Sequence, residues 1–230
     1  IQPIKEIGII CKEHNLHFIV DAAQTAGIIP IDVKESQIDA LCFTGHKGLL
    51  GPQGIGGMIL TKEMAQSLTP LIAGGTGSFS HLETMPTNMP DAFESGTLNL
   101  PGIIGLNEGL TFIESKGMEN IHNHELALTE AFLKGLRPID GINIIGKQDV
   151  QDLTAVVSIT IDGADAASVA YELESTYHIM TRVGLHCAPR AHQTLGTYPE
   201  GTVRFSFGYA NTIEDIETAL SALTTIANKI

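Results

Sequence analysis

Two short apolar segments near the start of the chain each end in polar side chains suited to ligand binding. Residues His17 to Val20 are followed at once by Asp21, and residues Ile38 to Phe43 are followed by Thr44-Gly45-His46-Lys47. An amphipathic stretch, Ile4 to Glu13, precedes the first of them. This alternation of helix and short strand predicts an α/β layer with a mainly parallel sheet. In such sheets ligands bind beyond the carboxyl ends of the strands, which is where these polar residues are expected to lie.

The rest of the chain indicates a second, different domain. Residues 57–60 read as another strand, residues 72–99 as a long polar connection, and residues 101–137 as helix with a break at Gly117. We then expect strands at 142–145, 155–161 and 202–207, an extended segment near 179–182, and helices at 165–175 and 212–228. Mixed strands and helices of this kind predict a small α+β domain. We therefore expect two domains, residues 1–115 and residues 116–230.

Composition excludes several classes of protein. The formal net charge is −13, with 13 Lys and Arg against 26 Asp and Glu, so a nucleic-acid partner is not expected. No apolar run approaches the roughly 20 residues that span a bilayer, and no signal-peptide pattern is present, so we expect no membrane partner. Three cysteines, an odd number, favour a reducing, cytoplasmic compartment. Cys and His do not recur at zinc spacing, so no metal site is predicted and the histidines outside the motifs are read as ordinary polar residues.

Lys47 has the surroundings of a reactive lysine. It lies just past a predicted strand, beside His46, and is followed by Gly48 and Gly51, which let a backbone approach a bulky group. A neutral lysine amine is a nucleophile toward aldehydes. A phosphate-binding loop of the nucleotide enzymes is the rival interpretation. It fails because no Gly-Lys followed by Ser or Thr occurs here, and Lys47 precedes the glycines where that motif places it after them.

Two motifs together, Val20-Asp-Ala-Ala-Gln24 and Thr44-Gly-His-Lys-Gly-Leu-Leu-Gly-Pro-Gln-Gly54, resemble those of the class V aminotransferases, in their cysteine desulfurase and selenocysteine lyase branch. The resemblance implies a pyridoxal 5′-phosphate (PLP) enzyme of fold type I, with a partial large domain and a small C-terminal domain. It also implies these roles: Lys47 forms the Schiff base, Asp21 pairs with the pyridine nitrogen, Gln24 bonds the phenolic oxygen, and Thr44 and His46 contact the phosphate. A further stretch, Phe93-Glu-Ser-Gly-Thr97-Leu-Asn99, resembles the family segment that reaches a neighbouring subunit, which implies that Thr97 contacts the phosphate across a homodimer.

Cys187 differs from the other two cysteines. It lies in Arg182-Val-Gly184-Leu-His-Cys187-Ala-Pro189, among polar, cationic and conformationally special residues, which favours a partly exposed thiol tuned by His186 or Arg182. Cys11 and Cys42 lie in apolar patterns and are read as small buried hydrophobic residues. The resemblance implies that Cys187 attacks the sulfur of the substrate and keeps it as a persulfide. Leu185 departs from the histidine often found in this branch, which leaves the subfamily and the acceptor protein open.

Two arginines are candidates for binding the substrate. Arg204 lies in the strand-like Gly201-Thr-Val-Arg-Phe-Ser206 and could form a bidentate pair with an α-carboxylate. Taken alone, an arginine in a strand is more often an ion pair. The resemblance assigns the substrate carboxylate to Arg204 and a second, less defined place near the substrate to Arg182.

The resemblance therefore implies a PLP-dependent cysteine desulfurase that converts L-cysteine to L-alanine, with a sulfur-acceptor protein as a further partner. Selenocysteine lysis, transamination and a noncatalytic binding protein on the same fold remain alternatives. Members of the family are considerably longer, so we expect an N-terminal truncation and weak or absent PLP binding by this chain alone. A fragment and a second chain that completes the fold are both open explanations.

Overall fold

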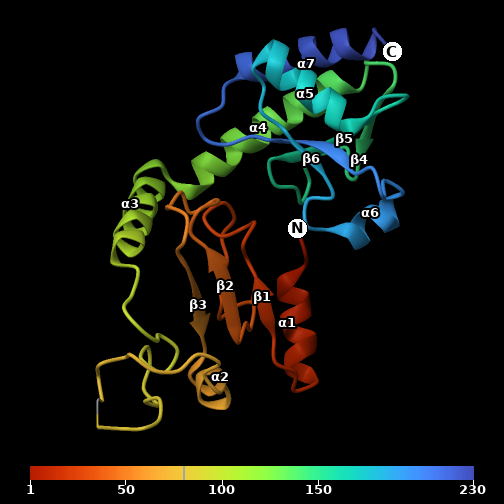
Figure 1. Ribbon diagram of the computed structural model, residues 1–230. Helices are drawn as coiled ribbons and strands as arrows, with labels where there is room; N and C mark the ends of the chain where they lie inside the picture. The colour runs from red at the N-terminus through yellow and green to blue at the C-terminus, as the bar shows by residue number, and fades with distance from the viewer. Residues whose placement is uncertain (80) are drawn as a thin grey trace. The chain divides into compact units, whose positions relative to one another are not determined.

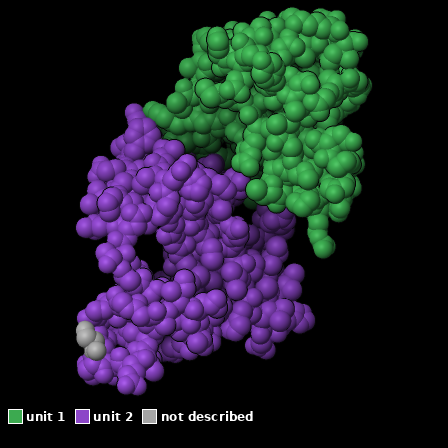
Figure 2. Space-filling model, in the orientation of Figure 1, with its two compact units in different colours: residues 1, 120–230 green, residues 2–119 purple. Residues whose placement is uncertain are grey.

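The computed structural model describes residues 1–79 and 81–230. These fall into two compact units: residues 2–119, and residue 1 together with residues 120–230 (Figure 2). Each unit has its own hydrophobic core. The units are described separately below.

A three-stranded sheet forms the centre of residues 2–119 (Figure 1). Strand β1 (Ile19–Asp21) is parallel to β2 (Ala40–Thr44), and β3 (Gly56–Leu60) is antiparallel to β2. Helix α1 (Ile4–Glu13) begins and ends where the apolar periodicity predicts, and its apolar side chains pack on the core of this sheet. The expected parallel pairing holds for β1 and β2, whereas β3 returns in the opposite direction.

The connection after β3 contains a short helix, α2 (Lys62–Ser67), which the sequence did not predict. Among the described residues from 68 to 99 there is no helix or strand. Helix α3 (Leu100–Lys116) and helix α4 (Met118–Leu136) then follow, separated at Gly117 as expected. Gly117 has a φ of 82°, a conformation that only glycine adopts at little cost, and this ends the first helix.

Residues 120–230 form an antiparallel sheet in the order β4-β5-β7-β6. The strands are β4 (Ile142–Ile145), β5 (Val156–Ile161), β6 (Arg182–Gly184) and β7 (Thr202–Ser206). Helices α4, α5 (Ala166–Tyr177) and α7 (Ile213–Ala227) bury Phe132, Leu173 and Leu223 against this sheet. Side chains along β5 alternate between buried and more exposed, as a strand with one covered face requires.

Two details of this unit differ from the sequence prediction. The extended segment expected near 179–182 contributes only Arg182 to β6, which continues to Gly184. A short helix, α6 (Pro189–Leu195), lies between β6 and β7 and was not predicted. No helix formed by the described residues is long and apolar enough to cross a membrane.

Candidate active site

Asp21 and Thr44 lie on one rim of the sheet in residues 2–119. In the pairing of β1 with β2, Asp21 lies opposite Cys42, two residues before Thr44 at the end of β2. Side chains two residues apart on a strand point to the same face, so Asp21 and Thr44 share a face as well as an edge. The Asp21 carboxylate accepts a hydrogen bond from the backbone N–H of Ala23 at 2.9 Å. The parallel pairing thus brings the two strand-end motifs together, as expected.

Lys47 lies in a turn that starts directly after β2. The backbone N–H of Leu50 donates to the Lys47 carbonyl oxygen at 2.9 Å, and that of Gly51 donates to Gly45 at 2.8 Å. The Lys47 side chain is exposed, and within the described residues it forms no ion pair. Thr44 Oγ1 and His46 Nδ1 are hydrogen-bonded at 3.0 Å. The amine, the hydroxyl and the imidazole therefore belong to one short, backbone-braced segment.

The loop after β1, which carries Gln24, touches the Lys47 turn backbone to backbone. A Cβ atom placed on Gly27 would lie 2.4 Å from the Gly48 carbonyl oxygen, and one on Gly48 would lie 2.7 Å from the Ala26 oxygen. Both distances are shorter than carbon–oxygen contact permits. Gly27 also has a φ of 84°, which disfavours any other residue. The exposed Gln24 and the Lys47 turn are thereby held beside one another.

Helix α3 packs against the other side of the Lys47 turn. A Cβ atom on Gly109 would lie 2.4 Å from the Leu49 carbonyl oxygen. The helix can therefore carry no side chain at this position if the turn is to pack against it. Asn99 caps the helix by accepting from the N–H of Gly102 at 3.1 Å, and its Nδ2 donates to the Gly54 carbonyl oxygen at 2.9 Å. Sequence reasoning gave Asn99 no role of its own. An asparagine one residue before Leu100-Pro101 is a helix-start pattern that could have identified it.

Thr97 lies in an exposed bend just before α3. No described hydrogen bond joins it to Asp21, Thr44 or Lys47.

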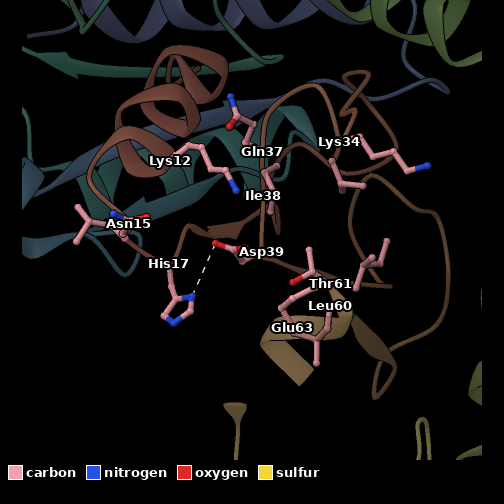
Figure 3. A pocket seen from close by; sticks show the side chains of 13 residues that line it. Lys12, Asn15, His17, Lys34, Gln37, Ile38, Asp39, Leu60, Thr61 and Glu63 are labelled. Carbon is pink, nitrogen blue, oxygen red and sulfur yellow. Dashed lines mark ion pairs between the residues drawn. The ribbon is translucent and has the colours of Figure 1, made fainter. Parts of the chain in front are cut away.

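A cavity of about 680 Å³ lies at the opposite end of the same strands, around the residues that precede β1 and β2 (Figure 3). Its walls include His17 and Asp39, whose Nδ1 and Oδ2 atoms are 4.0 Å apart, and Thr61. Asp39 is also held by the backbone N–H of Phe18 at 2.8 Å. None of the predicted site residues lines this cavity.

Arg182 and Arg204 form a directly opposed pair across β6 and β7. Two like charges in such a pair repel one another. Neither arginine has an acidic partner in the part of the chain that the structure describes, and Arg204 Nε is buried without a hydrogen-bond acceptor. Burial lowers the pKa of Arg204, and the neighbouring Arg182 lowers it further. The pair is a cationic position that a carboxylate would stabilise.

Cys187 is exposed and lies close enough to Arg204 for a thiolate to stabilise the charge of that arginine, which raises the arginine pKa. Cys11 and Cys42 are both half-buried, less fully enclosed than their apolar patterns suggested. His186 and Cys187 form the centre of a turn closed by the N–H of Ala188 donating to Leu185 at 2.8 Å. Arg182 thus lies in β6, Cys187 in the turn that follows this strand, and Arg204 in the paired strand β7.

Two histidines near Cys187 have threonine partners that the sequence did not reveal. His186 Nε2 is hydrogen-bonded to Thr202 Oγ1 at 3.1 Å, and His192 Nδ1 to Thr197 Oγ1 at 2.7 Å. The sequence indicates only an ordinary polar role for His192, yet this residue is buried in α6. The pairing depends on contacts between segments that are separate in sequence, so no local pattern indicated it.

The donors on the rim of β1 and β2 suit PLP. An aldehyde requires an amine without a carboxylate partner, which Lys47 offers, and a pyridine nitrogen requires a carboxylate, which Asp21 offers. Thr44 and His46 add hydrogen-bonding groups for an anion. Within the described residues no cluster of His, Cys, Asp or Glu suits a metal ion.

The chain is similar to known proteins over nearly its whole length. The aminotransferase class V family matches residues 1–219. A probable cysteine desulfurase of Methanothermobacter thermautotrophicus is 36% identical over 230 residues, covering 99% of this chain and 57% of the relative. A probable cysteine desulfurase of Pyrococcus abyssi is 36% identical over 226 residues, covering 97% of this chain and 55% of the relative. The chain thus spans a little over half the length of the curated relatives it matches.

Solved structures show the same mixed α/β fold. An apo cysteine desulfurase from Thermococcus onnurineus superposes with a TM-score of 0.92 at 34% identity, over 99% of this chain and 56% of that one. A cysteine desulfurase from Escherichia coli superposes with a TM-score of 0.88 at 26% identity, over 99% and 56%. The strand-end motifs, the fold and these matches lead to one conclusion: the chain belongs to the class V aminotransferase family.

Proposed function

We propose that the protein is a PLP-dependent cysteine desulfurase, which converts L-cysteine to L-alanine and transfers the sulfur to Cys187. The observation that carries this proposal is the position of Cys187, an exposed thiol beside the uncompensated pair Arg182 and Arg204. The relatives that the chain matches are named as cysteine desulfurases, which supports the same activity.

Residues of the β1 and β2 rim would hold the cofactor. Lys47 would hold it covalently through the side-chain amine, and Asp21 would face the pyridine nitrogen. Gln24, Thr44 and His46 would contact its oxygen atoms, and Thr97 would do so from a second copy of the chain. When bound, PLP supplies an electron sink for negative charge at the substrate α-carbon.

Arg204 would bind the substrate α-carboxylate with the planar, two-pronged geometry of its guanidinium group, and Arg182 would add positive charge beside it. Lys47 would move the proton at the α-carbon. The Cys187 thiolate would attack the substrate sulfur, so that a sulfur–sulfur bond forms while the carbon–sulfur bond breaks. The electron pair of the broken bond stays on the β-carbon, which is protonated to give alanine. Cys187 is oxidised to a persulfide as the β-carbon is reduced.

The partners and organisation follow from the same proposal. A homodimer would place Thr97 at a neighbouring site, and an acceptor protein would remove the sulfur from Cys187. The two domains would be residues 1–115, for the cofactor, and residues 116–230, for the cysteine. The odd number of cysteines supports a reducing, cytoplasmic compartment.

Two measurements on the full-length protein test this function. Borohydride reduction followed by mass spectrometry should place a pyridoxyl group on Lys47. After incubation with L-cysteine, a persulfide should be found on Cys187, and Cys187→Ser should lose sulfur transfer while Cys42→Ser retains it. A Cys187→Ser protein that forms alanine and sulfide at the normal rate would refute the proposal. Repeating the assay with selenocysteine distinguishes a lyase, for which the Cys187 variant would remain active.

A further inference from the structure

The turn that presents Cys187 has an unfavourable backbone. His186 has a φ of 50° and Cys187 a φ of 63°, so two consecutive non-glycine residues lie in the left-handed region. Side chains with a Cβ atom disfavour that region, and hairpin turns of this shape usually use Asn and Gly there. Contacts outside the turn must therefore stabilise it.

The His186 side chain supplies such a contact. Its Nε2 atom is hydrogen-bonded to Thr202 Oγ1, and Thr202 is fully buried on β7, directly opposite Gly184. Gly184 ends the strand that leads into the turn. The hydrogen bond thus ties the centre of the turn back to the strand pair from which it projects.

A second histidine–threonine hydrogen bond lies close to the His186–Thr202 bond. His192, on the helix that follows the turn, is hydrogen-bonded to Thr197, and the rings of His186 and His192 have centroids 5.8 Å apart. The His186 ring therefore lies against α6 as well as being hydrogen-bonded to the sheet. A Cβ atom on Gly201 would lie 2.4 Å from the Gly184 backbone, which shows how closely the two strands meet at this point.

Burial and the neighbouring positive charges favour the neutral form of the His186 ring by lowering its pKa. Burial lowers the pKa of His186, the cationic Arg204 and then His192 lower it further, and Arg182 adds to the effect, against an opposing contribution from Thr202. The arginines face it from β7 and β6, and His192 faces it from α6. A neutral imidazole can donate or accept at Nε2, so the neutral form is compatible with the bond to Thr202.

We propose that His186, through its hydrogen bond to Thr202, is a positioning residue that holds Cys187 in the geometry needed for attack on the substrate sulfur. The proposal rests on the function proposed above for Cys187. His186 itself exchanges no proton with the substrate. Loss of the hydrogen bond lets the turn relax to ordinary backbone angles, which moves the thiol while leaving it exposed.

Four variants of the full-length protein test this role: His186→Ala, His186→Gln, Thr202→Val and the double variant His186→Ala with Thr202→Val. We expect His186→Ala and Thr202→Val each to slow persulfide formation at saturating L-cysteine by about tenfold, with KM changed by less than about threefold. The double variant should be no slower than the slower single variant, because both remove one bond. Glutamine can place an amide near the Nε2 position, so His186→Gln should recover the rate to within about threefold of wild type.

Two controls distinguish a misplaced Cys187 thiol from a general loss of structure and from a loss of thiol reactivity. Thr194→Val, an exposed threonine on α6, should leave the rate unchanged, and alkylation of Cys187 by iodoacetamide should remain at least as fast in His186→Ala as in wild type. Additive losses in the double variant, a normal rate in Thr202→Val, or equal losses in His186→Gln and His186→Ala would each overturn the proposal. If Cys187→Ser abolishes sulfur transfer while these outcomes occur, only the positioning role fails. If Cys187→Ser remains active, the proposed function fails instead.

Discussion

Gly27 and Gly48 are in backbone contact at the rim of β1 and β2, so closely that neither can carry a Cβ atom without displacing the other segment. Gly27 follows the Asp21 motif and Gly48 follows Lys47 directly. The contact therefore sets the spacing between the carboxylate-bearing loop and the lysine-bearing turn. In the proposed enzyme, this spacing would separate Asp21, which would face the pyridine nitrogen of PLP, from Lys47, which would bind PLP covalently.

Gly48→Ala should weaken PLP binding by about tenfold or more. Its Cβ atom would lie 2.7 Å from the Ala26 carbonyl oxygen, so the Lys47 turn must move. Titration of the full-length protein with PLP, followed by absorbance, measures the affinity. Gly208→Ala is the matched control, because nothing lies within 4 Å of a Cβ atom at that position. Equal affinities in the two variants would show that the contact does not position the lysine.

Asn99 has two functions that substitution can separate. Asn99→Asp keeps the oxygen that accepts from Gly102 but loses the donor to Gly54, whereas Asn99→Ala loses both. We expect Asn99→Ala to lower the free energy of unfolding by about 1 kcal/mol, the usual value of a helix cap. Asn99→Asp should retain that stability, as chemical denaturation would show. Both variants should bind PLP more weakly, because the Gly54 end of the Lys47 turn is released. An Asn99→Asp protein as unstable as Asn99→Ala would argue against the assignment of the cap.

Arg204→Lys should raise the KM for L-cysteine by roughly 10- to 100-fold, with a smaller effect on kcat. Lysine keeps the charge but lacks the planar pair of N–H groups that binds a carboxylate at two points. Arg190→Lys, an exposed arginine on α6, is the control and should leave the KM unchanged. Steady-state kinetics at fixed pH measures both constants. If the two lysine variants behave alike, Arg204 does not bind the substrate carboxylate.

Glu125 should make the stability of residues 120–230 depend on pH. It is buried on α4, its Oε2 atom has no hydrogen-bond partner, and burial raises its pKa from 4.5 to about 7, with His124 opposing the shift. Because the pKa is higher in the folded state, stability is greatest below about pH 4.5 and is lost as pH rises toward 7.

Glu125→Gln removes this titration and should raise the thermal midpoint at pH 8 by on the order of 2–4 °C while changing it little at pH 5. Glu119→Gln, an exposed glutamate on the same helix, should not alter the pH profile. Thermal unfolding followed by circular dichroism at both pH values provides the measurement. A Glu125→Gln protein that keeps the wild-type dependence would assign the pH effect to another group.

The two short helices and the bounds of β6 could not be predicted from sequence patterns. Helices α2 and α6 have 6 and 7 residues, less than two full turns, so apolar periodicity could not reveal them. Their caps were visible: Thr61 accepts from Met64, and Pro189 begins the second helix. The bounds of β6 depend on its pairing with β7, since a strand of three residues has no pattern of its own.

The amino-acid sequence by itself determined the two strand-end motifs, the cysteine between glycine and proline, the long helices and most of the strands. These features depend on side-chain chemistry and on the spacing of apolar residues within a single segment, so they can be recognised without knowledge of tertiary contacts. Only the tertiary structure decided that Gly27 meets Gly48, that Arg182 lies opposite Arg204, and that His186 is bonded to Thr202. Each of those contacts joins segments whose distance in space depends on sheet register and helix packing, and no local propensity encodes it.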